Sequence, residues 1–257
     1  MLCKVCSMES NFCFSEKVMG KYNVDYYHCL NCDFIQTEDP YWLEEAYSRS
    51  INLSDTGYMV RNQYYASRFT VLLYMLFGKK GRYLDYAGGY GVFVRMMRDI
   101  GFDFIWDDKY TQNMFASGFE WDQKSRVDAV TLFEVFEHFV QPMDEIGKLL
   151  KISDTIIFST ELHPDPVPEP KDWWYYGLDH GQHISFYSKS TLEFIAKKYE
   201  LNYYSIGSLH ILTNKNISGW ALLATRLSKL GMHKIFAKKL TSKTMLDYDL
   251  IIKAGKE

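Results

Sequence analysis

The sequence predicts an α/β fold in which a mainly parallel sheet carries helices on both faces, preceded by a small β segment at the N-terminus. Three observations predict this architecture. All five cysteines lie within the first 32 of 257 residues, which sets the N-terminal segment apart. A strand-like run at residues 82–86 passes through a glycine-rich turn into a helical pattern. Strand and helix patterns then alternate over residues 127–206, as in sheets built from βα units.

The composition is that of a folded protein with no evident affinity for nucleic acid or membranes. Hydrophobic residues make up 47% and charged residues 24% of the chain, which excludes a largely disordered protein. The net charge of −3 offers no overall attraction to nucleic acid or anionic lipid. The N-terminus lacks the basic and apolar regions of a secretory signal, and no run of about 18 uncharged apolar residues occurs. We therefore expect a cytoplasmic protein without a transmembrane segment.

Four of the cysteines form two Cys-x-x-Cys pairs, Cys3 with Cys6 and Cys29 with Cys32. Each such turn can place two thiolates on one ion, so two turns complete the tetrahedral four-thiolate site of structural zinc. Free thiols in a small β domain are the alternative. A segment of this size cannot bury a core by itself, so metal binding would supply much of its folding energy. We therefore expect residues 1–40 to be a zinc-binding, zinc-ribbon-like segment.

Residues 41–80 are expected to form a helical cover or lid. A short helix is predicted over residues 42–47 and a longer one over residues 58–77. Apolar residues of the longer helix recur at steps of three and four and define one face, which indicates packing against a sheet. These residues are Tyr65, Phe69, Leu72, Leu73 and Leu76.

A glycine-rich turn, residues 87–91, follows the strand predicted over residues 82–86 and precedes a helix predicted over residues 92–100. This order presents backbone N–H groups at the helix N-terminus and lets a ligand approach closely. Val94 occupies the position at which a dinucleotide-binding turn needs a small residue, so a nicotinamide- or flavin-dependent dehydrogenase is disfavoured. No Gly-Lys-Ser/Thr sequence follows, which excludes a P-loop at this turn.

A second strand is predicted over residues 102–108, and it ends in Asp107 and Asp108, about 20 residues beyond the glycine-rich turn. A carboxylate at this place suits a ribose, because it can accept hydrogen bonds from both hydroxyl groups. We expect Asp108 to be the ribose ligand, with Asp107 as the reserve. An exposed acidic strand end is the alternative.

The alternation continues with a buried strand over residues 127–133 and a loop that holds Glu134, Glu137 and His138. Glu134 would lie at the carboxyl end of that strand. For Glu137 and His138, a structural role in bracing the loop competes with a catalytic one. The other elements predicted in this region are a helix over 142–150, a strand over 154–160, a helix over 189–199 and a strand over 201–206.

These segments resemble the motifs of the class I S-adenosylmethionine-dependent methyltransferases. Leu84–Gly91 is similar to motif I of that family, with Ala87 where the family usually has glycine, and residues 127–138 resemble its motif after the fourth strand. The resemblance implies a Rossmann-like sheet of seven strands within residues 81–257, S-adenosylmethionine as cofactor, and methyl transfer. It assigns cofactor binding to Asp85, Ala87, Gly88, Gly89, Gly91, Asp107, Asp108 and Glu134.

An aromatic segment after the fifth strand narrows the resemblance. His180–Ser188, within an expected substrate loop at residues 161–188, resembles an element of sugar-modifying methyltransferases that carry an N-terminal zinc-binding segment. The resemblance implies a sugar, nucleotide-sugar or surface-glycan precursor as acceptor and His183 as general base. His180 is a competing base, and orienting a lid by hydrogen bonds is the alternative role for both. Gln182 stands where the subgroup typically has glutamate, which leaves methylation of carbon, oxygen or nitrogen open.

The C-terminal part is expected to insert helices, over residues 214–244, before a last strand over residues 245–253. The insertion has an apolar stripe flanked by lysines. Such a stripe usually faces the core, and a peripheral contact with a membrane is the alternative. The stripe comprises Trp220, Leu223, Leu227 and Leu230, and the lysines are Lys229, Lys234, Lys238 and Lys239.

Two other functions fit parts of the pattern. An RNA methyltransferase would use the zinc segment to contact nucleic acid, but the net charge disfavours it. A catalytically silent module would bind zinc and cofactor without transferring a methyl group, and Ala87 and Gln182 are the departures that favour it. The interpretation that we favour is methyl transfer to a small-molecule acceptor of sugar type.

Overall fold

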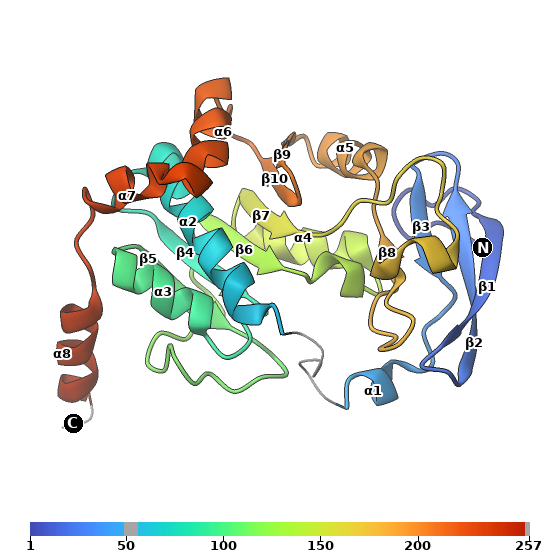
Figure 1. The fold of residues 1–257 in the computed structure, drawn as a ribbon, viewed down its shortest axis with the longest axis horizontal. Coiled ribbons are helices and arrows are strands. Elements are labelled where there is room, and N and C mark those ends of the chain that lie inside the picture. The colour runs from blue at the N-terminus through green and yellow to red at the C-terminus, as the bar shows by residue number, and fades with distance from the viewer. Residues whose placement is uncertain (49–55, 255–257) are drawn as a thin grey trace. The chain divides into compact units, whose positions relative to one another are not determined.

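The computed structural model describes residues 1–48 and 56–254 (Figure 1). Residues 49–55, which belong to the helical cover predicted at residues 41–80, lie outside the described residues. The described chain divides into two compact units. The first unit holds residues 1–48, 133–151 and 157–214, and the second holds residues 56–132, 152–156 and 215–254.

A six-stranded sheet runs in the order β5-β4-β6-β7-β10-β9. β4 pairs in parallel with both β5 and β6, whereas β9 and β10 form an antiparallel hairpin. Nearly all residues of β6, β7 and β10 are buried, as expected of strands covered on both faces. The predicted α/β fold with a mainly parallel sheet is thus confirmed. The bounds are β4 Arg82–Tyr86, β5 Asp103–Asp107, β6 Ala129–Phe133, β7 Thr155–Ser159, β9 Asn202–Ile206 and β10 Leu209–Thr213.

The described part of this sheet has six strands rather than the seven implied by the resemblance. Residues 245–253, predicted as the last strand, form a helix, α8 (Thr244–Ala254). The strand that pairs with β9 is instead β10, which follows β9 through a turn at Gly207 with a φ of +66°. A glycine tolerates this left-handed backbone and so permits a tight hairpin. The helices predicted as an insertion before the last strand therefore follow it.

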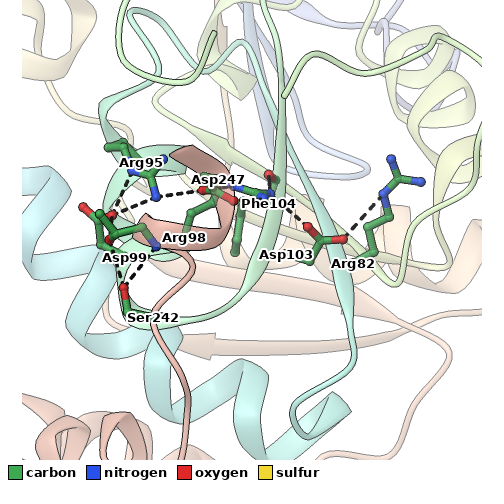
Figure 2. Close-up of polar contacts among 9 residues, drawn as sticks. Arg82, Arg95, Arg98, Asp99, Asp103, Phe104, Ser242 and Asp247 are labelled. Atoms are coloured by element: carbon green, nitrogen blue, oxygen red, sulfur yellow. Dashed lines mark hydrogen bonds and ion pairs between the residues drawn. The ribbon is translucent and has the colours of Figure 1, made fainter. Parts of the chain in front are cut away.

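A buried ion-pair network anchors the start of α8 in the second unit (Figure 2). The Asp247 carboxylate accepts hydrogen bonds from Arg98 Nε and Nη2 at 2.8 and 2.7 Å and from Arg95 Nη2 at 2.9 Å. Arg98 Nη1 also donates to Asp103 and to the carbonyl of Phe104, at 2.9 and 2.7 Å. Asp247 lies in the first turn of α8, where the helix dipole favours a carboxylate. Apolar residues suit this segment to a strand, but the tertiary ion pair stabilises it as a helix.

The helices of the second unit pack around α2 (Tyr58–Phe77). The predicted apolar face of α2 is confirmed, since Tyr65, Phe69, Leu72 and Leu73 are buried. The core-facing stripe predicted after residue 217 is wrong for its large members: Trp220, Leu223 and Leu230 are exposed. α6 buries small residues instead, and these allow a close approach to α2. The helices that contact α2 are α3 (Val92–Ile100), α6 (Gly219–Arg226), η4 (Leu227–Leu230) and α7 (Met232–Ala237).

The described helices lack the properties of a membrane span. None of them is both long enough and apolar enough to cross a bilayer. The longest, α2, has 20 residues but carries Arg61 and Arg68 among them.

The first unit contains a second, antiparallel sheet in the order β1-β2-β3-β8. β8 belongs to the segment predicted as a substrate loop at residues 161–188, and it pairs with β3. The rings of Trp173, Tyr175 and Tyr176 are buried in a core shared with this sheet. The aromatic segment is therefore mainly a packing element. The bounds are β1 Asn11–Val18, β2 Tyr22–Cys29, β3 Phe34–Thr37, β8 Ser185–Phe186, α1 Leu43–Ala46, α4 Pro142–Ile152, α5 Lys189–Lys198, η1 Phe136–His138, η2 Pro170–Asp172 and η3 Trp174–Tyr176.

Replacing Asp247 by alanine should lower the free energy of unfolding by about 3–5 kcal/mol, because the buried Arg98 guanidinium loses its bidentate counter-charge. Urea-induced unfolding measures this difference. Glu193, in an exposed pair with Lys189 at 3.3 Å, is the matched control, and Glu193→Ala should cost less than about 1 kcal/mol. Equal losses in the two variants would contradict the anchoring role of Asp247.

Candidate active site and metal centres

In the second unit, the glycine-rich turn after β4 adopts a backbone that favours glycine. Ala87, Gly89 and Gly91 have φ values of +57°, +54° and +82°, in the left-handed region where side chains are strained. Ala87 therefore occupies a position for which glycine is better suited. A Cβ atom added at Gly88 would lie 2.8 Å from Asp85 Oδ2, so lack of space requires glycine there.

Hydrogen bonds from β5 hold the turn in place. The N–H group of Gly88 donates to the carbonyl of Asp107 at 3.1 Å, and the Trp106 indole N–H group donates to the carbonyl of Gly89 at 2.8 Å. α3 begins after Gly91 without a side-chain cap. A helix N-terminus without a side-chain cap can donate its first N–H groups to a polar or anionic ligand.

The two acids at the end of β5 have different partners. Asp108 accepts hydrogen bonds from three backbone N–H groups, among them that of Gly89, at distances of 2.9, 2.7 and 2.8 Å. Its carboxylate thus closes the loop. Asp107 accepts a hydrogen bond from the Gln123 side chain at 2.6 Å, and burial raises its pKa. Asp107, the reserve of the sequence prediction, is thus the one of these two acids whose carboxylate does not bond the turn.

Asp85, in β4, supports the turn from within the second unit. Its side chain is buried, and Oδ1 accepts a hydrogen bond from Thr131 Oγ1 at 2.6 Å. Burial raises the pKa of Asp85 to about 7, and the nearby charge of Asp108 acts in the same direction. Since Oδ2 also limits the space at Gly88, we interpret Asp85 as a support of the turn rather than a direct ligand of the cofactor.

In the first unit, Glu134 follows β6 with a φ of +54°, which is unusual for glutamate. Two hydrogen bonds with Ser159 hold it: the Glu134 N–H group donates to Ser159 Oγ at 3.0 Å, and Ser159 Oγ donates to Glu134 Oε1 at 2.6 Å. The hydroxyl group of Tyr175 donates to Glu134 Oε2 at 3.1 Å. Backbone strain of this kind costs of order 1–3 kcal/mol and occurs preferentially at functional sites.

A chain of hydroxyl groups leads from Glu134 to Glu137, which is fully buried. Tyr175 OH lies 3.2 Å from Thr160 Oγ1, and Thr160 Oγ1 donates to Glu137 Oε2 at 3.0 Å. The other oxygen, Glu137 Oε1, is buried without a hydrogen-bond partner among the described residues. Burial raises the pKa of Glu137 well above its ordinary value. Glu137 therefore lies at the centre of a buried polar cluster.

Two imidazole rings face the unpartnered oxygen of Glu137. His138 Nε2 lies 3.7 Å and His183 Nε2 4.0 Å from Glu137 Oε1. The other ring nitrogens are engaged, His138 Nδ1 with Tyr47 OH at 2.6 Å and His183 Nδ1 with the Tyr175 carbonyl at 2.7 Å. Because a carbonyl only accepts, His183 Nδ1 carries the proton, and Nε2 of the neutral ring presents a lone pair. Burial lowers the pKa of both histidines, that of His183 to about 3.

His180 is less suited to act as a base. Its Nδ1 accepts a hydrogen bond from the backbone N–H group of Gln182 at 3.2 Å, so Nε2 carries the proton in the neutral ring. Gln182, which stands at the position of the expected acid, is buried and donates to the carbonyl of Ala46 at 2.8 Å. The carboxyl group beside His183 is therefore that of Glu137, which belongs to the loop after β6.

The cysteines of the two Cys-x-x-Cys pairs lie together. Cys3 Sγ is 3.5 Å from Cys32 Sγ, Cys6 Sγ is 3.4 Å from Cys29 Sγ, and all four sulfur atoms lie within 4.8 Å of one another. Thiolates bound to a tetrahedral zinc ion at ~2.3 Å are about 3.8 Å apart. The four sulfur atoms therefore fit a four-thiolate metal site, and Cys13 is not part of this cluster.

Ser159, Thr160 and Tyr47 were not predicted from the sequence as site residues. Ser159 and Thr160 end the strand predicted over residues 154–160, and polar residues at the carboxyl end of a buried parallel strand are a signal that could have found them. Tyr47 carries no such signal, because its partner His138 is distant in the sequence.

Asp85→Asn should flatten the pH dependence of stability. The pKa of Asp85 is raised from 3.8 to about 7 in the folded protein, so between these values the folded state holds a proton that the unfolded chain releases. The free energy of unfolding of the wild type should therefore fall as the pH rises from about 4 to about 7. Between about pH 5 and about pH 8, the wild type should lose roughly 2–3 kcal/mol relative to the variant in urea unfolding. Parallel pH profiles would contradict this expectation.

Comparisons with known proteins identify a family to which this chain is similar. Residues 60–206 match the profile of a protein family described as a methyltransferase domain. The chain is similar to the plantazolicin methyltransferase BpumL in complex with S-adenosylhomocysteine (14% identity, 77% of this chain and 85% of that chain, TM-score 0.49). No curated protein matches the chain. A second similar structure is the magnesium protoporphyrin IX methyltransferase (ChlM) from Synechocystis PCC 6803 with bound S-adenosylhomocysteine (14% identity, 66% of this chain and 90% of that chain, TM-score 0.42). A third is an O-methyltransferase family protein from Burkholderia thailandensis (14% identity, 69% of this chain and 68% of that chain, TM-score 0.44).

The family match covers more than half of the chain. Its range includes the strand, glycine-rich turn and helix at residues 82–100, and the loop from Glu134 to His138. The mainly parallel sheet and the turn with its adjacent acids agree with this match. The chain therefore belongs to the methyltransferase-domain family and is an S-adenosylmethionine-dependent methyltransferase.

Proposed function

We propose that the enzyme methylates a hydroxyl group of a small sugar-type acceptor, such as a nucleotide-sugar or surface-glycan precursor, and that His183 removes the hydroxyl proton. The observation that carries the proposal is the lone pair of His183 Nε2 beside the buried carboxyl group of Glu137. S-adenosylmethionine supplies, when bound, a methyl group on a positively charged sulfur. The protein then has to orient the acceptor and take up its proton.

For cofactor binding, we assign the glycine-rich turn at residues 87–91 and Asp107 in the second unit. The backbone of the turn is held open by Asp85 and Asp108, so these two carboxylates act through the turn. Asp107 ends β5 and is the acid that we assign to the ribose hydroxyl groups. The sequence resemblance also assigns Glu134 to the cofactor, and the strained backbone of this residue supports a functional role.

The geometry of His183 supports its role as the base. The hydrogen bond from Nδ1 to the Tyr175 carbonyl fixes both the orientation of the ring and its tautomer. Once Nε2 has taken a proton, the positive ring would favour ionisation of the Glu137 carboxyl group, whose Oε1 is 4.0 Å away, and the resulting carboxylate would stabilise the ring. His180 remains the second candidate, although its neutral tautomer presents a proton at Nε2.

The choice of a sugar hydroxyl rests on the sequence resemblance and on two observations. Gln182 replaces the acid of the carbon-methylating subgroup, and its amide is used in a structural hydrogen bond to the Ala46 carbonyl, which favours transfer to oxygen. Trp174 is 78% exposed, whereas Trp173, Tyr175 and Tyr176 are buried. Trp174 is therefore the ring of this segment that we assign to stacking against a sugar.

We also propose one structural zinc ion at Cys3, Cys6, Cys29 and Cys32. The sulfur–sulfur distances support this assignment. The ion would link the end of β2, at Cys29, to the N-terminal Cys-x-x-Cys turn of Cys3 and Cys6. Because this sheet shares a core with Tyr175, whose carbonyl holds His183, the zinc ion would support the base through the packing of the first unit.

The test of the proposed function is methyl transfer from isotopically labelled S-adenosylmethionine to a panel of nucleotide-sugars and free sugars, with tRNA measured beside them. We expect label in a sugar hydroxyl of at least one member of the panel. Label in tRNA alone would overturn the sugar proposal in favour of the RNA alternative. Label on a sugar carbon would overturn the choice of oxygen.

His183→Gln should lower the turnover rate by about 10²- to 10⁴-fold, the usual contribution of a general base. Calorimetry should show that the variant still binds S-adenosylmethionine, because His183 is not assigned to the cofactor. His180→Gln is the matched control and should lower turnover by less than about tenfold, since the base would remain. A larger loss in His180→Gln than in His183→Gln would assign the base to His180.

Cys29→Ser should remove the zinc ion from the four-cysteine site and destabilise the first unit, because metal binding supplies folding energy to small segments. Titration with Co²⁺ as a substitute ion measures the loss through the thiolate-to-cobalt charge-transfer absorption. Cys13→Ser, which removes a cysteine outside the cluster, should retain the absorption. Full retention in Cys29→Ser would contradict the four-cysteine assignment.

A further inference from the structure

Three atoms that can donate electron pairs meet at one point of the first unit, and residues 1–48 and 56–254 supply no cation beside them. Glu137 Oε1 and the Nε2 atoms of His138 and His183 all lie within 4.8 Å of one another. The hydrogen bond from His183 Nδ1 to the Tyr175 carbonyl leaves a lone pair on its Nε2. His138 Nδ1 lies 2.6 Å from Tyr47 OH, and when Nδ1 donates this hydrogen bond, His138 Nε2 also presents a lone pair. Acceptors that face one another in a buried place are unfavourable unless a positive species lies among them.

A shared proton does not satisfy this cluster. The distances from Glu137 Oε1 to His138 Nε2 and His183 Nε2 are 3.7 and 4.0 Å. Hydrogen bonds between nitrogen and oxygen are about 2.7–3.2 Å long. Accordingly, Glu137 Oε1 is buried and has no partner among the described residues. A metal ion is larger: ligand atoms at ~2.1 Å from a tetrahedral ion are about 3.4 Å apart, so small movements of the two imidazole rings toward Glu137 Oε1 would bring these two distances to those of a metal site.

The surroundings of the three ligand atoms are also those of a metal site. In such sites, each ligand is oriented by a hydrogen bond from its remote side to a second group. His183 is hydrogen-bonded to the Tyr175 carbonyl, and His138 is hydrogen-bonded to Tyr47 OH. Glu137 Oε2 accepts a hydrogen bond from the hydroxyl group of Thr160 at 3.0 Å. The His138 and His183 side chains are 20% and 11% exposed, whereas the Glu137 side chain is fully buried.

We propose that Glu137 Oε1, His138 Nε2 and His183 Nε2 bind a first-row transition-metal dication such as Zn²⁺, at a site separate from the four cysteines. Two imidazoles and one carboxylate match the preferences of zinc and its neighbours, whereas Mg²⁺ and Ca²⁺ prefer an all-oxygen shell. Three protein ligands leave a coordination position open to water or to an acceptor.

The consequence for activity rests on the proposed function. The lone pair of His183 Nε2 can form a coordinate bond to the ion or accept the acceptor's proton, but not both. No electron transfer is involved: the ion leaves and the proton takes its place, or the reverse. Occupation of the site should therefore inhibit methyl transfer, and removal of the ion by a chelator should restore it.

The first measurement is the zinc content of the full chain after equilibration with excess Zn²⁺ and dialysis. The wild type should hold two ions, and His138→Gln and Glu137→Gln should each hold one. His233→Gln makes the same chemical change at a histidine outside the cluster and should hold two. A wild type with one ion, or a His138→Gln variant with two, would overturn the proposal.

Co²⁺ substitution separates the two sites and identifies variants that fail to fold. The four-cysteine site gives a charge-transfer absorption from thiolate, whereas a site of two imidazoles and a carboxylate gives only weaker d–d bands. The His138→Gln variant should keep the first signal and lose the second, which shows a folded first unit lacking one site. A second cobalt ion bound with thiolate absorption would place it on sulfur and overturn the assignment.

The inhibition is measured as turnover against Zn²⁺ concentration. In the wild type, filling the second site should lower turnover at least tenfold, with recovery on chelation. Unchanged or raised turnover with the second site filled would overturn the competition at His183. Metal content and cobalt spectra need no turnover, so failure to find any sugar acceptor would count against the proposed function and leave the metal site testable.

Discussion

The burial of one carboxyl group, that of Glu137, constrains the first unit. A carboxyl group without exposed surface requires polar neighbours, and here they come from separate segments: Thr160 after β7, His138 in the same loop and His183 in the aromatic segment. The backbone follows the same pattern, because the N–H group of Ile184 donates to the carbonyl of Glu137 at 2.9 Å. The contacts that surround the carboxyl group therefore also fix the imidazole rings.

Two side-chain hydrogen bonds reinforce this junction. Ser185 Oγ donates to the carbonyl of Phe139 at 2.7 Å, and the hydroxyl group of Tyr187 donates to the carbonyl of Phe136 at 3.0 Å. Both attach the aromatic segment to the loop after β6. Since β8, in the same segment, also pairs with β3, the cysteine-bearing sheet and the histidines are parts of one packed unit. This explains why an aromatic-rich segment is needed there: most of its rings fill the core that positions His183.

In the second unit, two carboxylates likewise stabilise the backbone conformation. Asp108 is engaged by backbone N–H groups, and Asp85 is buried against Thr131, so both stabilise the glycine-rich turn. The Asp107 carboxylate instead bonds the Gln123 side chain and does not contact the turn. Sequence spacing alone does not distinguish the roles of the neighbouring Asp107 and Asp108, because these roles depend on which carboxylate accepts hydrogen bonds from the turn.

The sequence by itself determined the short-range features. Apolar periodicity placed α2 and α3, and the strand, glycine-rich turn and helix around residue 88 carried the family assignment, because these patterns depend on neighbours within a few residues. The tertiary structure decided what depends on distant partners. Residues 245–253 have a strand-like composition, but they form a helix whose first turn is anchored by the ion pair of Asp247 with Arg98. In the same way, only the folded chain brings Glu137 to His183, because the neighbours of a buried polar group come from segments that sequence spacing does not reveal.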